Sequence, residues 1–215
     1  MISNIQQLRR EYVQASLDER DVAENPFEQF QKWFEEALNS SVLEPNAMTL
    51  ATSDAAGNPS ARIVLLKGLA DDGFVFFTNY RSRKAEELAQ NSRACLLFFW
   101  KELERQVRIE GAASKISEAA STEYFQSRPK ASQIGAWVSP QSQTIESREL
   151  LEQKYQEVAE KYKDSDVLPR PAHWGGYAVK PEKIEFWQGR PSRLHDRILY
   201  SLTDSKIWKI ERLAP

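Results

Sequence analysis

Three closely spaced residues near the end of the chain form the most informative pattern for chemistry. Arg193, His195 and Arg197 alternate along a predicted strand, so their spacing of two places all three side chains on one face. Two guanidinium groups beside an imidazole are suited to holding an anion or an aromatic ring. The same pattern also occurs on solvent-exposed edge strands, where charges discourage aggregation. The residues alone leave both interpretations open.

Four further cations stand where a phosphate group could be bound. Arg83 and Lys84 follow Ser82 at the predicted start of a helix, where free N–H groups and the helix dipole attract anions. Two cations oppose that dipole unless an anion binds beside them, which favours a binding site. Arg62 and Lys67 lie at the two ends of an apolar strand, and they either reach a pocket mouth or extend into solvent.

Another candidate group crosses a predicted helix end. Tyr124, Arg128 and Ser132 are spaced by four residues, so they either share one face and bind a phosphate together or are surface neighbours. Cys95 lies within an apolar strand and is interpreted as a small packing residue. One cysteine and two histidines are too few for a Cys- or His-rich metal site, so no metal is expected.

The elements that must position these groups are mainly short strands with a few helices between them. Apolar periodicity and turn residues predict helices over 8–13, 25–38, 82–90, 117–126 and 146–163. They predict strands over 48–53, 61–67, 74–78, 94–100, 105–113, 176–179, 183–188, 193–202 and 208–213. Many short strands joined by hairpin-sized breaks favour an α+β protein built on an antiparallel barrel.

The composition excludes several classes of function. The 215 residues carry 29 Lys+Arg against 31 Asp+Glu, so no overall positive field attracts nucleic acid or an acidic membrane. The 8 glycines form neither a G-x-G-x-x-G nor a Gly-Lys-Ser/Thr motif, so side chains must hold any phosphate. No apolar stretch approaches the ~20 residues of a membrane span and no signal-peptide pattern is present, so a cytoplasmic protein is expected.

Ordered motifs along almost the whole chain resemble the pyridoxamine 5′-phosphate oxidase family. The most specific block is Ile184–Gly189 followed by Arg193–Arg197, and the chain closes with Arg212–Pro215. The earlier matching motifs are Leu8–Tyr12, Arg62–Lys67, Ser82–Lys84, Leu103–Val107, Ser127–Pro129, Ser132–Val138 and Trp174–Tyr177. The departures are mild: 189–192 is a variable stretch, and Ala178 stands where a basic residue is common in the family.

The resemblance implies a fold, an activity and a partner. The expected fold is one FMN-binding split antiparallel β-barrel domain over 1–215, with a mobile segment at 1–24 and a dimerisation and substrate part at 174–215. The implied activity is oxidation of pyridoxamine or pyridoxine 5′-phosphate to pyridoxal 5′-phosphate by hydride transfer to flavin N5. O₂ would accept the electrons and give H₂O₂, and the protein would be a homodimer with FMN at the subunit interface.

The resemblance also implies which side chains bind each ligand. The expected FMN contacts are Arg62, Ile63, Val64, Leu65, Leu66, Lys67, Phe77, Thr78, Arg83, Lys84, Gln106, Gln141, Ser142, Trp187 and Arg197. The expected substrate contacts are Arg9, Tyr12, Lys67, Tyr124, Arg128, Ser132, Arg193 and His195. Arg193 and His195 are expected against the substrate ring as the catalytic pair, and Arg9 and Tyr12 belong to a segment that closes over the site.

Two other functions remain open from the sequence. One is a different flavin oxidoreductase on the same barrel, and the other is a non-catalytic carrier of pyridoxal phosphate or flavin. The complete set of expected substrate residues argues against a different reductant. Turnover under O₂ with release of peroxide separates an oxidase from a carrier.

Overall fold

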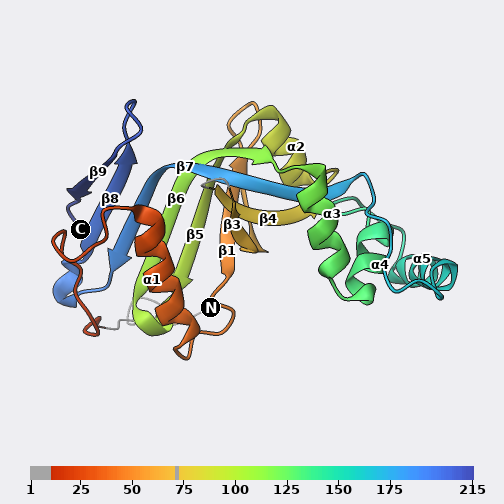
Figure 1. Cartoon of the computed structure of the whole chain (residues 1–215), viewed down its shortest axis with the longest axis horizontal. Coiled ribbons are helices and arrows are strands. Elements are labelled where there is room, and N and C mark those ends of the chain that lie inside the picture. The colour runs from red at the N-terminus through yellow and green to blue at the C-terminus, as the bar shows by residue number, and fades with distance from the viewer. Residues whose placement is uncertain (1–10, 71–72) are drawn as a thin grey trace, which may run out of the picture. The chain divides into compact units, whose positions relative to one another are not determined.

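The computed structural model describes residues 11–70 and 73–215 of the chain (Figure 1). The helices are α1 (Pro26–Leu38), α2 (Arg83–Gln90), α3 (Glu118–Ser127), α4 (Lys130–Val138) and α5 (Arg148–Lys161). The strands are β1 (Ala47–Ser53), β2 (Pro59–Leu65), β3 (Gly68–Ala70), β4 (Gly73–Asn79), β5 (Arg93–Trp100), β6 (Arg105–Lys115), β7 (Trp174–Gln188), β8 (Asp196–Leu202) and β9 (Trp208–Arg212). Two 3₁₀ turns are η2 (Lys101–Leu103) and η3 (Pro191–Arg193).

All the strands in this described part of the chain belong to one sheet. Its order is β2-β1-β5-β6-β7-β4-β3, with β8 paired to β7 and β9 paired to β8. Strand β4 is antiparallel to β3 and β7, and β8 is antiparallel to β7 and β9. Two registers matter for the site: Phe77 faces Gly176 across β4 and β7, and Trp187 faces Arg197 across β7 and β8.

The chain divides into two compact units. The first unit comprises Met1–Thr49, Cys95–Glu110 and Pro181–Pro215, and the second comprises Leu50–Ala94 and Gly111–Lys180. Strands β1, β5, β6 and β7 contribute residues to both units. In neither unit do the described residues contain a helix with the length and apolar character needed to cross a bilayer.

The core of the first unit forms where α1 packs against strands. Asn25 caps the helix by accepting a hydrogen bond from Phe27 N, and Pro26 occupies the first turn. The predicted apolar stripe is confirmed, since Phe30 and Trp33 are buried. The Phe30 ring lies 5.2 Å from that of Phe98 on β5, and Trp33 meets Phe186 on β7 edge to face.

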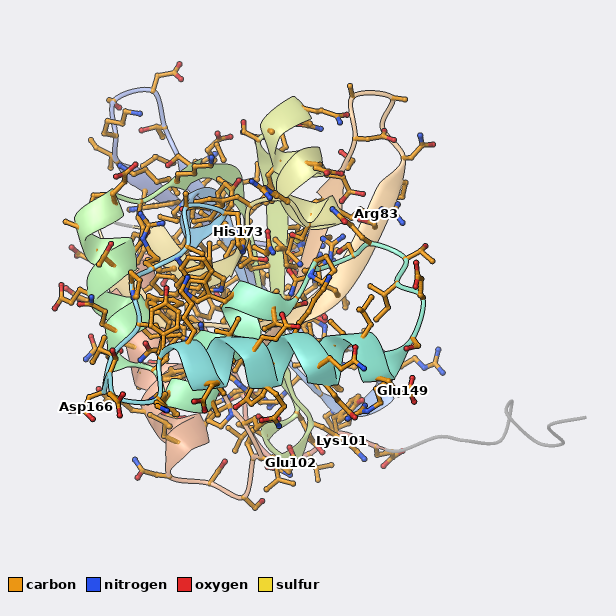
Figure 2. All side chains as sticks on the ribbon, turned by 90° about the vertical axis from the view of Figure 1, so that its right-hand side faces the viewer. Arg83, Lys101, Glu102, Glu149, Asp166 and His173 are labelled. Carbon is orange, nitrogen blue, oxygen red and sulfur yellow. The ribbon has the colours of Figure 1, made fainter. Side chains whose placement is uncertain are left out.

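The second unit buries an aromatic cluster between its helices. Phe125, Ile134, Leu168 and Trp174 form this cluster, so α3 and α4 are held against the start of β7. Helix α5 has no fully buried residue and packs on the cluster through half-buried side chains. Figure 2 shows the charged side of α5, with Glu149 near its first turn and Asp166 in the loop that follows.

Two predictions of element boundaries were wrong, and both errors involve proline. The predicted strands 176–179 and 183–188 are one continuous strand, β7. Pro181 lies on β7 between Val179, the last residue paired with β4, and Lys183, the first residue paired with β8. Proline is tolerated where a strand is unpaired on one side. Helix α4 was not predicted, because Pro129 was interpreted only as a stop, whereas it stands at the N-cap position of the next helix.

Two predictions near helix starts also need correction. Glu11–Val13, the described part of the predicted helix 8–13, is not helical. The helix predicted over 82–90 is confirmed as α2, but Ser82 does not cap it through its side chain. The Ser82 hydroxyl instead donates to the carbonyl of Asn79 at 2.7 Å, which fixes the turn that leads into the helix.

Candidate active site

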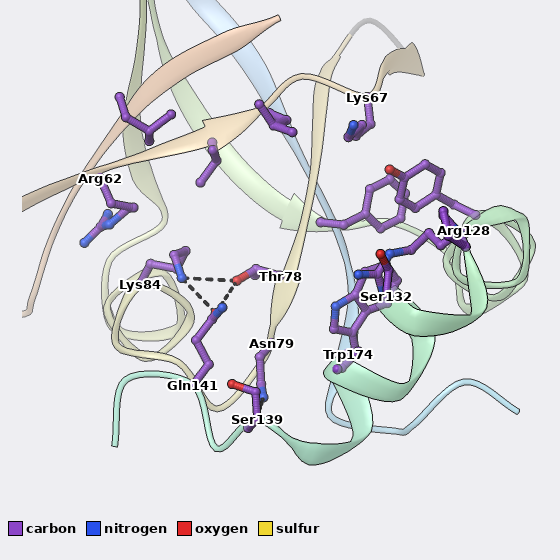
Figure 3. A pocket seen from close by; sticks show the side chains of 18 residues that line it. Arg62, Lys67, Thr78, Asn79, Lys84, Arg128, Ser132, Ser139, Gln141 and Trp174 are labelled. Carbon is purple, nitrogen blue, oxygen red and sulfur yellow. Dashed lines mark hydrogen bonds between the residues drawn. The ribbon is translucent and has the colours of Figure 1, made fainter. Parts of the chain in front are cut away.

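The second unit contains a cavity of about 670 Å³, here called the cationic pocket (Figure 3). Its walls come from β2, β4, α2, α3, α4, the loops beside α4 and the first residue of β7. Four cations line it, and none of the described lining residues is a carboxylate. The lining residues are Arg62, Ile63, Val64, Leu65, Lys67, Phe77, Thr78, Asn79, Lys84, Tyr124, Arg128, Pro129, Ser132, Gly135, Ala136, Ser139, Gln141 and Trp174.

One end of the pocket is built around the ammonium group of Lys84, in the first turn of α2. The residue is only 9% exposed. Its Nζ donates to Gln141 Oε1 at 3.0 Å and to Thr78 Oγ1 at 3.3 Å (Figure 3). It also donates to Ser82 Oγ at 3.3 Å. Burial and, second, the charge of Arg62 lower the pKa of Lys84 to about 8. Because these three hydrogen-bond partners are neutral, the ammonium charge remains available to an anion.

Arg62 completes this end of the pocket and is anchored by Glu87, one turn further along α2. The Glu87 carboxylate lies 3.3 Å from Arg62 Nη2 and accepts a 2.8 Å hydrogen bond from Arg83 Nε. It also accepts hydrogen bonds from the Thr52 and Ser60 hydroxyls. Burial acts to raise the pKa of Glu87, but these hydrogen bonds and the charge of Arg62 outweigh it and hold the pKa at about 2. Glu87 is therefore a carboxylate throughout the physiological range.

The other end of the pocket contains a guanidinium group with unused hydrogen-bonding capacity. Arg128 Nη1 is buried and has no hydrogen-bond partner among the described residues. The guanidinium lies 4.6 Å from the ring centroid of Trp174, and burial lowers the pKa of Arg128. Lys67 and Ser132 line the same pocket, and Figure 3 shows Lys67 and Arg128 on the side away from Arg62. A buried donor without a partner is costly, so this end is suited to an anion.

Three nearly parallel rings, those of Phe77, Tyr124 and Trp174, cluster beside Arg128. The Phe77 ring stacks on that of Tyr124 with centroids 3.9 Å apart and on that of Trp174 with centroids 5.3 Å apart. The register of β4 against β7 leaves room for Phe77 because Gly176 lies opposite, and a Cβ there would come within 2.9 Å of Phe77 Cε1. The three rings therefore form an apolar wall next to the cationic groups.

The lining includes residues that the sequence did not single out as site residues: Asn79, Pro129, Gly135, Ala136, Ser139 and Trp174. Three of them follow Ser132 at helical spacing, and this small-residue face of α4 borders the cavity. Asn79 Nδ2 donates to the carbonyl of Ser139 at 3.2 Å and ties the end of α4 to the end of β4. The spacing of small residues after Arg128–Pro129 was the available signal, but it required α4 to be predicted first.

Most of the residues predicted to bind FMN or the substrate phosphate come together in this pocket. Leu66, Arg83 and Ser142 belong to the same unit but do not line it. Leu66 is buried, and Arg83 is exposed with its Nε bonded to Glu87 (Figure 2). Ser142 is exposed, with a left-handed φ of 71° directly after Gln141. Tyr12, Gln106, Trp187, Arg193, His195 and Arg197 belong to the first unit. Arg9 lies outside the described residues.

The prediction that Arg193, His195 and Arg197 share one face of a strand was wrong. Strand β8 starts at Asp196, so only Arg197 belongs to it. Ser192 and Arg193, both within η3, have left-handed φ values of 57° and 62°, which turn the chain before the strand begins. Arg193 is exposed on this turn and has no ion-pair partner within 11–70 or 73–215. The three residues, with Glu185 and Trp187, are called the C-terminal cluster below.

The ring of His195 contacts two aromatic side chains. Its ring centroid is 4.6 Å from that of Trp187 and 5.8 Å from that of Tyr12. A Cβ on Gly189 would come within 2.7 Å of Tyr12 Cγ, so the glycine permits this close approach. The Nδ1 atom of His195 accepts a 3.1 Å hydrogen bond from Arg190 N, which leaves the proton of the neutral ring on Nε2. Burial, and next the charge of Arg193, lower the pKa of His195.

Arg197 is held by internal hydrogen bonds. Its Nε donates to Glu185 Oε1 at 2.7 Å, its Nη2 to Glu185 Oε2 at 3.1 Å, and its Nη1 to the carbonyl of Ala214 at 2.8 Å. Glu185 also accepts a hydrogen bond from Arg108 Nη2. The hydrogen bonds that Arg197 donates to Glu185 raise the pKa of Arg197. Gln106, the remaining predicted FMN contact, is half-buried on β6.

Comparisons with known proteins identify the family of this chain. Residues 34–162 match the family described as pyridoxamine 5′-phosphate oxidase, and residues 174–215 match the pyridoxine 5′-phosphate oxidase C-terminal dimerisation region. A pyridoxine/pyridoxamine 5′-phosphate oxidase of Nostoc sp. (strain PCC 7120) is 58% identical over 215 residues, which is 100% of both chains.

Two solved structures share the fold. PhzG from Burkholderia lata 383, in complex with tetrahydrophenazine-1-carboxylic acid, has a TM-score of 0.88 at 30% identity, over 94% of this chain and 99% of that chain. A pyridoxamine 5′-phosphate oxidase-related, FMN binding protein from Nostoc punctiforme PCC 73102 has a TM-score of 0.71 at 20% identity, over 89% and 98%. The predicted α+β split barrel is therefore confirmed. The molecule is a split-barrel enzyme, an oxidoreductase, and the chain belongs to the pyridoxamine 5′-phosphate oxidase family.

Proposed function

We propose that this protein oxidises pyridoxamine or pyridoxine 5′-phosphate to pyridoxal 5′-phosphate with FMN as cofactor and O₂ as electron acceptor. The observation that carries the proposal is the cationic pocket, which has the buried ammonium of Lys84 at one end, the buried Nη1 atom of Arg128 at the other, and no carboxylate in the described lining. A bound flavin phosphate and a substrate phosphate would supply two anions for these two ends. Full-length relatives at 58% and 54% identity are named for oxidation of the same two substrates.

The residues present fit FMN in their chemistry. The chain has no glycine-rich phosphate loop, and Lys84 offers a buried ammonium with only neutral hydrogen-bond partners. Arg62 adds a guanidinium beside it, so this end suits a phosphate dianion. We therefore assign FMN to the predicted set, with the pocket side chains as its phosphate-binding core. The set is Arg62, Ile63, Val64, Leu65, Leu66, Lys67, Phe77, Thr78, Arg83, Lys84, Gln106, Gln141, Ser142, Trp187 and Arg197.

When bound, FMN supplies a two-electron acceptor that takes a hydride from substrate C4′ at N5 and passes both electrons to O₂, giving H₂O₂. The residues of the chain bind and orient the two rings rather than form covalent bonds. Lys67, Tyr124, Arg128 and Ser132 are assigned to the substrate phosphate, where Arg128 Nη1 would gain the partner it lacks. Arg193 and His195 are assigned to the substrate ring, and the segment with Arg9 and Tyr12 to closure over it.

The proposed assembly is a homodimer with FMN at the subunit interface. Support comes from residues 174–215, which match a dimerisation region. We further propose that 1–215 act as one functional domain, in which 1–24 move and 174–215 supply dimer and substrate contacts. A matched dimerisation region predicts one particle of twice the chain mass in light scattering. A fully active monomer at micromolar concentration would contradict the homodimer.

Anaerobic reduction of the purified protein tests the chemistry directly. Addition of pyridoxamine 5′-phosphate without O₂ should bleach the flavin absorption band, and O₂ should restore it with one H₂O₂ per pyridoxal 5′-phosphate. Acid release should give FMN at one per chain. Release of FAD, or no flavin after reconstitution, would overturn the cofactor assignment. Unchanged absorption with tightly bound pyridoxamine 5′-phosphate would instead indicate a carrier, and bleaching only by a different reductant would indicate another flavin oxidoreductase.

A further inference from the structure

Glu87 is a buried carboxylate that does not line the cationic pocket but contacts one of its cations. The residue is 5% exposed and lies on α2, one turn after Lys84. Its carboxylate forms ion pairs with Arg62 and Arg83 and accepts hydrogen bonds from the Thr52 and Ser60 hydroxyls. Arg62 has further anchors, because its Nη1 donates to the carbonyl of Leu50 at 3.1 Å and to Thr52 Oγ1. This network determines where the Arg62 guanidinium lies in the pocket wall.

We propose that Glu87 is a positioning residue for this end of the pocket: it fixes the Arg62 guanidinium and supplies the negative charge that lets Arg62 and Lys84 remain charged side by side. The proposal rests on the FMN-binding function proposed above, because it concerns the two cations assigned to the flavin phosphate. It gives Glu87 a role in cofactor affinity although the carboxylate itself would repel a phosphate.

The charges around Lys84 explain why a counter-charge is needed. Within the described chain, the charged groups that act on its ammonium are Arg62 on β2 and Glu87 on its own helix. The groups in direct contact, on β4, before α2 and after α4, are neutral. An arginine stays protonated in proteins, so Lys84 is the member of the pair that loses its charge when repulsion or burial increases. Glu87 opposes both effects by raising the pKa of Lys84.

The pH at which FMN affinity starts to fall is therefore the decisive readout. Below the pKa of Lys84, which is about 8, the ammonium is charged and the affinity for a phosphate dianion should be constant. Above it, the free protein must take up a proton to bind FMN, so Kd rises with pH. Removal of Glu87 lowers the pKa of Lys84 and should move this break to lower pH. Absolute affinity is less informative, because the same change also removes a repulsion on the phosphate.

The test is a set of flavin fluorescence titrations on the full-length protein stripped of flavin, from pH 6.5 to 9.5. We expect Glu87→Gln to move the break in FMN Kd down by about one pH unit. The matched control is Glu86→Gln, which removes the same charge from the same helix at an exposed position and should leave the break in place. Riboflavin, which lacks the phosphate, should show no such break with any variant.

A second pair of variants covers the case in which Glu87→Gln does not fold. Removing one partner of a buried ion pair destabilises a protein more than removing both. The double variant Arg62→Gln/Glu87→Gln should therefore fold, and it is compared with Arg62→Gln. Arg62→Gln alone should move the break up, because it removes the charge that lowers the pKa of Lys84. Adding Glu87→Gln should move it down again.

The outcomes separate this role from the proposed function. Suppose that the wild-type protein binds FMN with a break near pH 8, that Glu87→Gln leaves this break in place, and that the double variant has the same break as Arg62→Gln. The role of Glu87 is then overturned, while the proposed function stands. Equal shifts with Glu86→Gln and Glu87→Gln would show a general charge effect and also overturn it. A wild-type protein that binds no FMN at any pH overturns the proposed function, and this inference with it.

Discussion

The cationic pocket and the C-terminal cluster both contain arginines, but Arg128 in the pocket and Arg197 in the cluster differ in how their charge is balanced. Arg197 in the cluster uses all three guanidinium nitrogens, two on Glu185 and one on the carbonyl of Ala214. Arg128 in the pocket stacks on Trp174 and leaves Nη1 buried without a partner among the described residues. The pKa of Arg197 is raised by its hydrogen bond to Glu185, whereas burial lowers the pKa of Arg128.

This difference shows that the charge of Arg197 is balanced within the protein, whereas Arg128 keeps a donor that a ligand can use. A buried charge is stable only when it is paired, and in the cluster Glu185 provides the pairing. In the pocket the compensating charge has to come from outside the described lining, which contains no carboxylate. Substitution of Glu185, the carboxylate that pairs Arg197, should therefore act mainly on stability, and substitutions at the Arg128 end of the pocket should act mainly on binding.

The largest expected effect is on stability, from Glu185→Gln in the cluster. The side chain of Glu185 is 3% exposed, and its loss leaves Arg197 and Arg108 without their shared carboxylate. Breaking a buried pair costs roughly 3–5 kcal/mol, and the partial exposure of both arginines favours the lower value, about 3 kcal/mol. Urea unfolding followed by circular dichroism measures the change. Glu102→Gln, exposed in the same unit, is the control, and a loss equal to that of the control would contradict the pairing role.

A smaller effect, on catalysis, is expected from Arg128→Ala in the pocket. Each charge-assisted hydrogen bond to the substrate phosphate contributes roughly 1.5–3 kcal/mol. The loss therefore corresponds to a fall of about 10- to 150-fold in kcat/KM for pyridoxamine 5′-phosphate. Pyridoxamine without the phosphate should be turned over equally by both proteins, and Arg148→Ala on the exposed face of α5 serves as a neutral control. An equal loss with both substrates would show that Arg128 does not bind the phosphate.

The fold could be predicted from the sequence wherever one local rule decided the structure. Helical spacing and the Asn25–Pro26 start predicted α1, and strand patterning predicted the antiparallel sheet. Proline caused the errors, because its effect depends on pairing that the local sequence does not specify. Pro181 lies between two pairings of β7, and Pro129 starts a helix instead of only ending one.

The site could be predicted in part, for a related reason. The spacing of four grouped Tyr124, Arg128 and Ser132, and all three line the pocket although a helix boundary falls between them. The spacing of two residues wrongly placed Arg193 on one strand face with His195 and Arg197, because the left-handed turn at Ser192 and Arg193 interrupts the extended backbone. Glu87 left no signal in the sequence, because a buried carboxylate on a helix looks like any charged surface residue until its partners are known.

A modest pH dependence of stability is expected from His195 in the cluster, which a fully solvent-exposed histidine would not cause. The pKa of His195 is lowered, so the unfolded chain binds a proton near pH 6.5 more readily than the folded protein. The free energy of unfolding should therefore fall as pH drops below 6.5, and protonation of Nδ1 breaks the hydrogen bond from Arg190 N. An NMR titration of the ring, assigned with His195→Gln, should show a midpoint below 6.5. Arg193→Gln should raise that midpoint, and no change would show that the two residues do not interact.

The smallest effect is expected from Cys95→Ser, which belongs to neither the pocket nor the cluster. Cys95 is half-buried on β5, its thiol donates weakly to the carbonyl of Leu96 at 3.8 Å, and burial raises the pKa of the thiol. A thiol that stays protonated is a poor nucleophile, and hydride transfer needs none. Serine keeps the size but places a more polar group in the strand, which costs about 1 kcal/mol. The FMN Kd and kcat/KM should match the wild-type values within error. Loss of turnover in a folded, flavin-loaded Cys95→Ser protein would mean that a thiol outside both cationic sites takes part in function.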